Sequence, residues 1–181
     1  MTLTDLASVG SFISGIAVVI TLVLLLIQLR QTNKNQRTLM QQGRSVRTVD
    51  LIAKMTEPHL SEIIVRAERN DLTLESPEVQ AYVRHCAAWL YSWKDSYLQH
   101  QAGTLDVESW ETDLAALKVV ASIPGFRVAW KFGRAWTSAT YRDFVDGLLR
   151  DTKVEQRSDY STLWKTWMAE ELAAMKSPAA T

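Results

Sequence analysis

The chain has 181 residues, with 20 basic and 20 acidic side chains and a formal net charge of zero. A dedicated nucleic-acid binder needs a basic excess for its phosphate contacts, so this balance argues against that class. With 47% hydrophobic residues, seven tryptophans and only seven glycines and four prolines, the chain can bury a core and lacks the composition of a disordered protein. Its single cysteine, Cys86, excludes an internal disulfide and any zinc site that takes two thiolates from one chain.

The N-terminal segment is the most apolar part of the chain. No formal charge occurs from Leu6 to Leu29, and the part from Phe12 onward is almost wholly aliphatic. As a helix, the part from Leu6 would be about 36 Å long, which exceeds the roughly 30 Å hydrocarbon core of a bilayer. A cleaved signal peptide would begin with basic residues and end at a small-residue cleavage site, and both are missing here. We therefore predict a transmembrane anchor over residues 1–29; a buried helix of a soluble core is the alternative.

Basic residues follow the anchor directly. They are Arg30, Lys34, Arg37, Arg44 and Arg47, with no acidic residue among them. Because the N-terminal side of the anchor has no Lys or Arg, the positive-inside rule predicts an external N-terminus and places residues 30–181 in the cytoplasm. The same charges could contact anionic lipid headgroups, although a role as topology markers is enough to explain them.

Small residues repeat along one face of the anchor. Ala7, Ser11 and Gly15 recur every four residues, and Gly10 and Ser14 form a second pair beside them. Such faces let transmembrane helices approach closely, so self-association or docking on another transmembrane helix is a hypothesis. The alternative is that the spacing means nothing, because small residues are frequent in such helices.

The rest of the chain predicts an all-α fold, because no alternating run is long enough for a sheet. Residues 30–57 contain no proline and one glycine and should continue the anchor as a helical stalk, with a bend at Gly43 as the open question. Residues 58–150 should form a compact cytoplasmic domain. Its expected helices are 59–69, 77–102 with Ser76 as N-cap and Gly103 as stop, one capped by Asp106 and ending at Pro124, 126–136, and 140–150.

The helix expected over residues 77–102 should carry the core of this domain. Tyr82, Cys86, Trp89, Trp93 and Tyr97 fall at helical spacing on one side. An aromatic stripe of this kind is more often packing than a cofactor cage, so we predict a hydrophobic core and no bound cofactor.

Residues 151–181 differ in character from the domain before them. Asp151 to Asp159 is polar and reads as a linker, and an amphipathic helix follows, with Trp164, Trp167, Met168 and Leu172 on one face. A helix that lies on a membrane surface is usually basic, whereas this one balances lysines against glutamates. Docking on a protein surface, its own or another subunit's, is therefore the favoured use.

A search for catalytic motifs returns none. The chain has no phosphate-binding loop, dinucleotide fingerprint, hydrolase elbow or H-E-x-x-H motif. His85 and His100 would be more than about 20 Å apart along one helix, too far to bind one metal ion. His85 and Cys86 are adjacent and would point about 100° apart, so they cannot easily act as base and nucleophile. We predict no enzymatic activity, no metal and no cofactor.

One basic cluster is a candidate binding site. Arg127, Lys131 and Arg134 share one face of the helix expected over residues 126–136, and Phe126 and Trp130 lie beside it. Such a face could hold an anionic ligand, a lipid headgroup or an acidic partner surface by charge and by stacking. The alternative is a solvated face whose charges pair with acidic residues elsewhere in the chain.

The order of these features resembles a widespread family of uncharacterised bacterial proteins, each with one membrane helix and a small helical domain. The resemblance covers about residues 5–149. It rests on the apolar helix running into Ile27-Gln28-Leu29-Arg30-Gln31-Thr32-Asn33, on Trp93 and Tyr97, on Gly103-Thr104-Leu105 before Trp110, on Pro124-Gly125 before Trp130, and on Tyr141 with Phe144-Val145. It implies a bacterial inner-membrane location and no activity or binding residues, and the C-terminal helix lies outside it.

Three classes of function follow from these features. The favoured one is a structural or interaction component of the membrane, either a homo-oligomer or an accessory subunit of a larger complex. The second is a membrane-anchored sensor or binding module for an anionic lipid or metabolite that uses Arg127, Lys131 and Arg134. An enzyme is the least favoured, because no set of nucleophile, base and oxyanion donor can be assembled from these residues.

Overall fold

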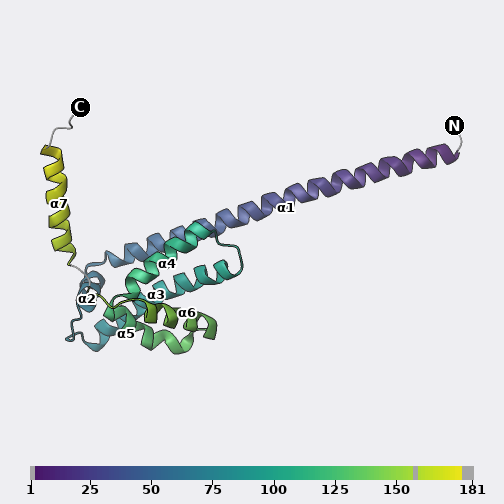
Figure 1. Cartoon of the computed structure of the whole chain (residues 1–181). Helices are drawn as coiled ribbons and strands as arrows, with labels where there is room; N and C mark the ends of the chain where they lie inside the picture. The colour runs from purple at the N-terminus through teal and green to yellow at the C-terminus, as the bar shows by residue number, and fades with distance from the viewer. Residues whose placement is uncertain (1–2, 157–158, 177–181) are drawn as a thin grey trace. The chain divides into compact units, whose positions relative to one another are not determined.

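The computed structural model describes residues 3–156 and 159–176, without the side chains of residues 5–7 and 9. In this part of the chain every regular element is a helix, which confirms the predicted all-α fold (Figure 1). The elements are α1 (Leu3–Met55), α2 (Pro58–Glu68), α3 (Ser76–Gln101), α4 (Val107–Ala121), α5 (Pro124–Gly133), the short 3₁₀ helix η1 (Arg134–Trp136), α6 (Ala139–Asp151) and α7 (Tyr160–Lys176).

The predicted anchor and stalk form one continuous helix, α1, and the helix is not interrupted at Gly43. Its length and apolar composition, with a mean hydropathy of 2.7 in its most apolar window, are sufficient to cross a membrane. All the large apolar side chains from Phe12 to Leu29 are exposed, as a helix surrounded by lipid requires. By its contacts the chain divides into two units, Met1–Val49 and Asp50–Thr181, so the predicted stalk of residues 30–57 is shared between them.

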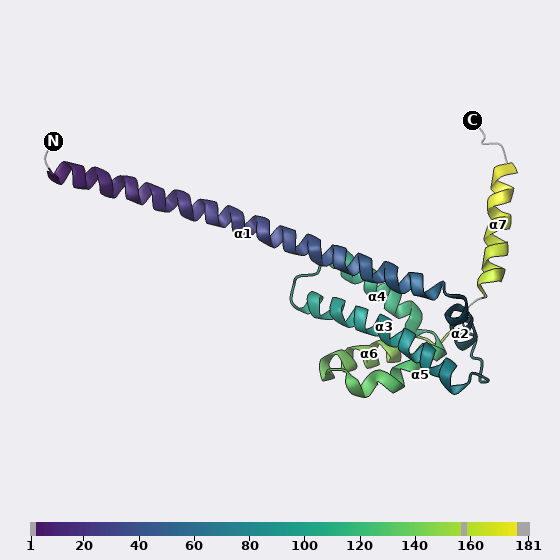
Figure 2. The same cartoon turned by 180° about the vertical axis from the view of Figure 1, so that it is seen from behind.

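Helix α3 is the central element of the second unit, because it contacts α2, α4 and α5 (Figure 2). The aromatic stripe predicted from the sequence forms much of the core: Tyr82, Cys86 and Trp93 are buried, and Trp89 and Tyr97 pack against them. Other elements complete the core with Ile63, Ile64, Leu117, Phe126, Trp130, Tyr141 and Val145, among others.

The helix ends follow local rules that the sequence carries. Asp106 caps α4 as predicted, because its Oδ1 accepts a hydrogen bond of 2.8 Å from the backbone nitrogen of Ser109. Gly103 ends the turn after α3 with φ +66°, a backbone conformation that suits glycine. The N-cap of α3 is Glu75 and not the predicted Ser76, since the Glu75 backbone nitrogen donates to Oε2 of Glu78 at 2.8 Å and the helix therefore starts one residue earlier.

Helices α2 and α5 meet at a close approach. A Cβ atom on Gly125 would lie 2.9 Å from the backbone oxygen of Ala67 and 2.9 Å from the hydroxyl oxygen of Tyr82. Only glycine therefore fits at the second position of α5 without displacing backbone. The helix predicted over residues 126–136 begins earlier, at Pro124, and its last three residues tighten into η1.

The segment after α6 returns across the compact part of the chain. The backbone nitrogen of Glu155 donates to the backbone oxygen of Ser122 at 2.9 Å. Asp159, just before α7, accepts a hydrogen bond of 2.6 Å from Arg69 at the end of α2. These two contacts connect the chain on either side of residues 157–158 to the end of α4 and to α2.

Candidate functional site

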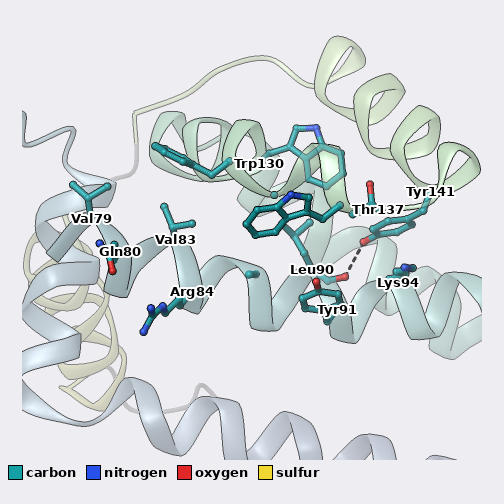
Figure 3. A pocket seen from close by; sticks show the side chains of 14 residues that line it. Val79, Gln80, Val83, Arg84, Leu90, Tyr91, Lys94, Trp130, Thr137 and Tyr141 are labelled. Atoms are coloured by element: carbon teal, nitrogen blue, oxygen red, sulfur yellow. Dashed lines mark hydrogen bonds between the residues drawn. The ribbon is translucent and has the colours of Figure 1, made fainter. Parts of the chain in front are cut away.

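An apolar groove of about 510 Å³ lies beside α3 in the second unit (Figure 3). One wall is a stripe of α3 that begins at Val79 and ends at Lys94, and includes Val83 and Ala87. The facing wall comes from the end of α5, from η1 and from the start of α6. A concave, mostly apolar surface of this size is the default candidate for binding in a protein without a catalytic motif.

The floor of the groove consists of buried side chains that a specific hydrogen bond holds together. Leu90, Trp130 and Tyr141 are at most 7% exposed. The Tyr141 hydroxyl donates to the backbone oxygen of Leu90 at 3.0 Å, which links α6 to the middle of α3 (Figure 3). Burial raises the pKa of Tyr141, so the phenol stays protonated and acts as a donor at neutral pH.

The rim of the groove is aromatic and exposed. Tyr91 on α3 and Phe132 on α5 are each 57% exposed, and Trp136 in η1 is 81% exposed. Soluble surfaces seldom present several large aromatic side chains around one concavity unless they bind something. Tryptophan and tyrosine are also the residues that most often dominate binding energy at protein interfaces.

Two basic side chains, Arg84 and Lys94, line the same groove from α3. Neither makes an ion pair within the described residues. Arg84 is exposed and Lys94 is half-buried. The groove therefore combines an apolar, aromatic surface with positive charge that nothing in the described chain neutralises.

The predicted basic face on α5 does not come together as one free surface. Nε of Arg127 donates to the backbone oxygen of Ala121 at 2.7 Å, and the same guanidinium donates to the backbone oxygen of Thr152. Arg134 pairs with Asp146, and this pair lowers the pKa of the Asp146 carboxyl. Lys131 alone is exposed without an ion pair among the described residues, so an anion would compete with contacts that two of the three side chains already make.

The residues predicted on the anchor all lie on α1. Gly10, Ser11, Ser14 and Gly15 are exposed, and space is open around both glycines, whereas the Ala7 side chain lies outside the described residues. The five predicted basic residues lie farther along α1, after its apolar segment; they are Arg30, Lys34, Arg37, Arg44 and Arg47. The roles in helix packing and lipid contact therefore stay predictions.

The predicted docking helix has its apolar face uncovered. On α7 the side chains of Trp164, Trp167, Met168 and Leu172 are all exposed. The groove and α7 are thus two apolar, aromatic surfaces of one chain that the described residues leave without a partner.

A second, smaller cavity of about 320 Å³ lies on another side of α3, next to His85, Cys86 and Trp89. Burial raises the pKa of the Cys86 thiol to about 12 and lowers the pKa of His85. Both groups are therefore neutral at neutral pH, and no thiolate is available to act as a nucleophile. No group of three metal-binding side chains gathers anywhere in the described residues.

The groove was not predicted, although the sequence of α3 carries a sign of it. A second apolar stripe, offset from the core stripe, runs along α3 through Val79, Val83, Ala87 and Tyr91. A helix with apolar residues on two sides has more apolar surface than one core can cover. That excess was the available sign of a binding surface.

Comparison of the chain with models of known protein families, with curated proteins and with solved structures finds no match. The resemblance to a family of bacterial membrane proteins therefore stays a prediction.

Proposed function

We propose that this protein is a single-pass membrane protein whose compact helical unit binds an apolar helical segment of a protein in its α3 groove. The observation that carries the proposal is the exposed aromatic rim formed by Tyr91, Phe132 and Trp136 around a concave apolar floor. Grooves of this shape accept the apolar face of an amphipathic helix, with large side chains as anchors. The protein acts as an interaction component, a homo-oligomer or an accessory subunit, and performs no chemistry.

The anchor supports a membrane setting for this interaction. We infer that α1 crosses the bacterial inner membrane, with the N-terminus outside and residues 30–181 in the cytoplasm, because every Lys and Arg near the span lies on its C-terminal side. Confinement to a bilayer raises the effective concentration of partners that share it, so a modest groove suffices for stable association.

The interaction is tested on the full-length protein extracted from its own cells in a mild detergent. The intact mass should exceed that of one chain, and Trp136→Ala should shift it to the mass of a monomer by removing an anchor from the rim. Leu72→Ala is the matched control, because Leu72 is 97% exposed and lies outside the groove. A monomeric wild-type protein, or a Trp136→Ala variant that keeps its full mass, contradicts the proposal.

The topology is tested with single cysteines and a maleimide that does not cross membranes. Thr4→Cys should be labelled in spheroplasts, and Asn35→Cys only after lysis. The native Cys86 is 4% exposed and should stay silent in both conditions. Labelling of Asn35→Cys in spheroplasts would overturn the orientation.

A further inference from the structure

The helix α7 has a property that an ordinary amphipathic helix lacks, a carboxylate within its apolar face. Glu171 follows Trp164 by seven residues and Trp167 by four, and it precedes Met175 by four. Positions at these intervals share one side of an α-helix, so the charge of Glu171 lies among the exposed aromatic and methionine side chains.

No cation on α7 can neutralise that carboxylate. Lys165 and Lys176 are six and five residues from Glu171, so neither stands at the three- or four-residue spacing that ion pairs on a helix require. Glu171 and the neighbouring Glu170 make no ion pair within the described residues. A surface that covers this face must therefore supply positive charge, because burying an unpaired carboxylate is costly.

The groove on α3 has the complementary composition. It offers an apolar floor and an aromatic rim, and its unpaired charges, Arg84 and Lys94, are both positive. The stripe from Val79 to Lys94 is about 22 Å long, and the face of α7 from Trp164 to Met175 is about 17 Å long, so the helix fits within the groove.

We propose that the α3 groove of one chain receives α7 of a second copy of the same chain, with Glu171 paired to Arg84 or Lys94. The inference rests on the proposed function and identifies the partner segment. Each copy has both a groove and an α7 helix, so each chain can place its α7 in the groove of the other. The result is a symmetric dimer with two equivalent contacts.

The place where α7 begins favours binding of α7 in the groove of a second copy over binding in the groove of its own chain. The ion pair between Asp159 and Arg69 and the backbone hydrogen bond between Glu155 and Ser122 hold the preceding segment at α2 and at the end of α4. Neither Arg69 nor Ser122 lines the groove, and no residue of α7 does so within this chain. Two copies anchored in one bilayer face each other at high effective concentration, which makes the exchange between chains favourable.

The experiment is disulfide cross-linking between two differently tagged full-length copies, co-expressed and oxidised in the membrane. One copy carries Ala87→Cys in the groove and the other carries Ala174→Cys, which lies beside Trp167 on the apolar face of α7. Two adjacent alanines give matched controls: Ala88→Cys lies on α3 outside the groove lining, and Ala173→Cys lies on the opposite side of α7. A mixture of wild-type copies shows the background from Cys86.

We expect a disulfide that joins the two differently tagged chains for Ala87→Cys with Ala174→Cys. The two control pairs, Ala88→Cys with Ala174→Cys and Ala87→Cys with Ala173→Cys, should give at least ten-fold less product. Glu171→Lys should reduce the product by a similar factor, and a groove copy that carries both Arg84→Glu and Lys94→Glu should restore it. Because none of the three side chains makes a hydrogen bond or ion pair within the described residues, this charge exchange breaks no polar contact of the fold.

Two results would overturn the inference. The first is a bond formed only within one chain of an Ala87→Cys/Ala174→Cys double variant, which would assign the groove to the chain's own α7. The second is no bond in either arrangement. If the extracted protein still exceeds the mass of one chain and loses that mass in Trp136→Ala, the proposed function stands with a different partner, whereas a monomeric wild-type protein removes both.

Discussion

The hydroxyl group of Tyr141 donates a hydrogen bond of 3.0 Å to the backbone oxygen of Leu90, and both residues form the floor of the groove. Tyr141 is fully buried, so its hydroxyl has no water to replace this acceptor. The bond ties α6 to α3 across 51 residues of sequence. The shape of the groove and the stability of the unit therefore depend on the same contact.

Tyr141→Phe removes this bond and keeps the ring. We expect the free energy of unfolding of the second unit to fall by about 1 kcal/mol, the net value of a typical buried hydrogen bond. The measurement is urea unfolding of the full-length protein in detergent, followed by near-ultraviolet circular dichroism. Tyr91→Phe is the control, because Tyr91 is exposed and makes no hydrogen bond among the described residues. An equal loss of unfolding free energy in both variants would show that the hydrogen bond from Tyr141 to Leu90 contributes no stability.

Gly125→Ala should destabilise the protein, because the new methyl group would lie 2.9 Å from the backbone oxygen of Ala67. Overpacking of this kind costs about 1–3 kcal/mol, and backbone cannot move aside as a flexible side chain does. Thermal unfolding of the variant should show a lowered midpoint. Gly147→Ala, in the interior of α6, would meet only the flexible end of the Arg150 side chain, at 3.7 Å, and should instead stabilise by up to about 1 kcal/mol. A neutral Gly125→Ala would contradict the close approach of α2 and α5.

The carboxylate of Asp146 should make stability depend on pH in the acid range. Arg134, and after it the indole nitrogen of Trp130 at 2.8 Å, lower the pKa of this carboxyl below its usual range. A carboxyl with a lowered folded-state pKa contributes stability above its ordinary pKa and loses that contribution as the pH falls through the lowered value. The contribution of Asp146 is therefore complete above about pH 5 and declines below about pH 4.

Asp146→Asn tests this dependence, because asparagine still accepts the hydrogen bond from Trp130 but cannot form the ion pair. We expect a loss of at most about 1 kcal/mol at pH 7, since the Arg134 side chain of the pair is 49% exposed and solvent screens the interaction. The difference from wild type should shrink as the pH falls toward 3 in a series of urea unfolding curves. A difference that stays constant down to pH 3 would show that the charge of Asp146 contributes nothing.

Cys86 should be inert in the folded protein. Its thiol is 4% exposed and burial raises its pKa to about 12, so the thiolate needed for alkylation is nearly absent at neutral pH. We expect maleimide modification at pH 7.5 to be at least about 100-fold slower than in the chain unfolded by guanidinium, because reaction requires opening of the core. Rapid modification of the native protein would revive a nucleophilic role for this residue.

The helices could be predicted because their boundaries are local. Proline at the first position of α2 and α5, the side chain of Asp106 before α4 and the glycine after α3 each act within a few residues. There are two exceptions. The helix predicted to begin at residue 126 begins at Pro124, and Ser76 had the right chemistry for a cap but lost this position to Glu75. Glu75 is the N-cap because its backbone nitrogen donates a hydrogen bond to the Glu78 carboxylate. This bond depends on the residues of the whole first turn and not on the capping residue alone.

The candidate site could be predicted only in part, because it depends on tertiary packing. The apolar face of α7 could be predicted from the helical spacing of its apolar residues. The exposure of Trp136 and Tyr91, in contrast, depends on how η1 and α3 pack against the other helices. The sequence places Arg127 next to Phe126 and near Trp130, with no acidic residue close by that could pair with it. One of its two acceptors, the backbone oxygen of Thr152, lies 25 residues away, so no local pattern could show that contact.

The contrast between the two tryptophans of the groove gives the surface an optical signature. Trp130 in the floor is 2% exposed and Trp136 on the rim is 81% exposed, so the first emits from an apolar environment and the second from water. Covering the groove would change the environment of the rim indole and leave the floor indole as it is. We therefore expect the emission of Trp136, isolated by subtracting the spectrum of a Trp136→Phe variant, to shift to shorter wavelength if a partner segment fills the groove.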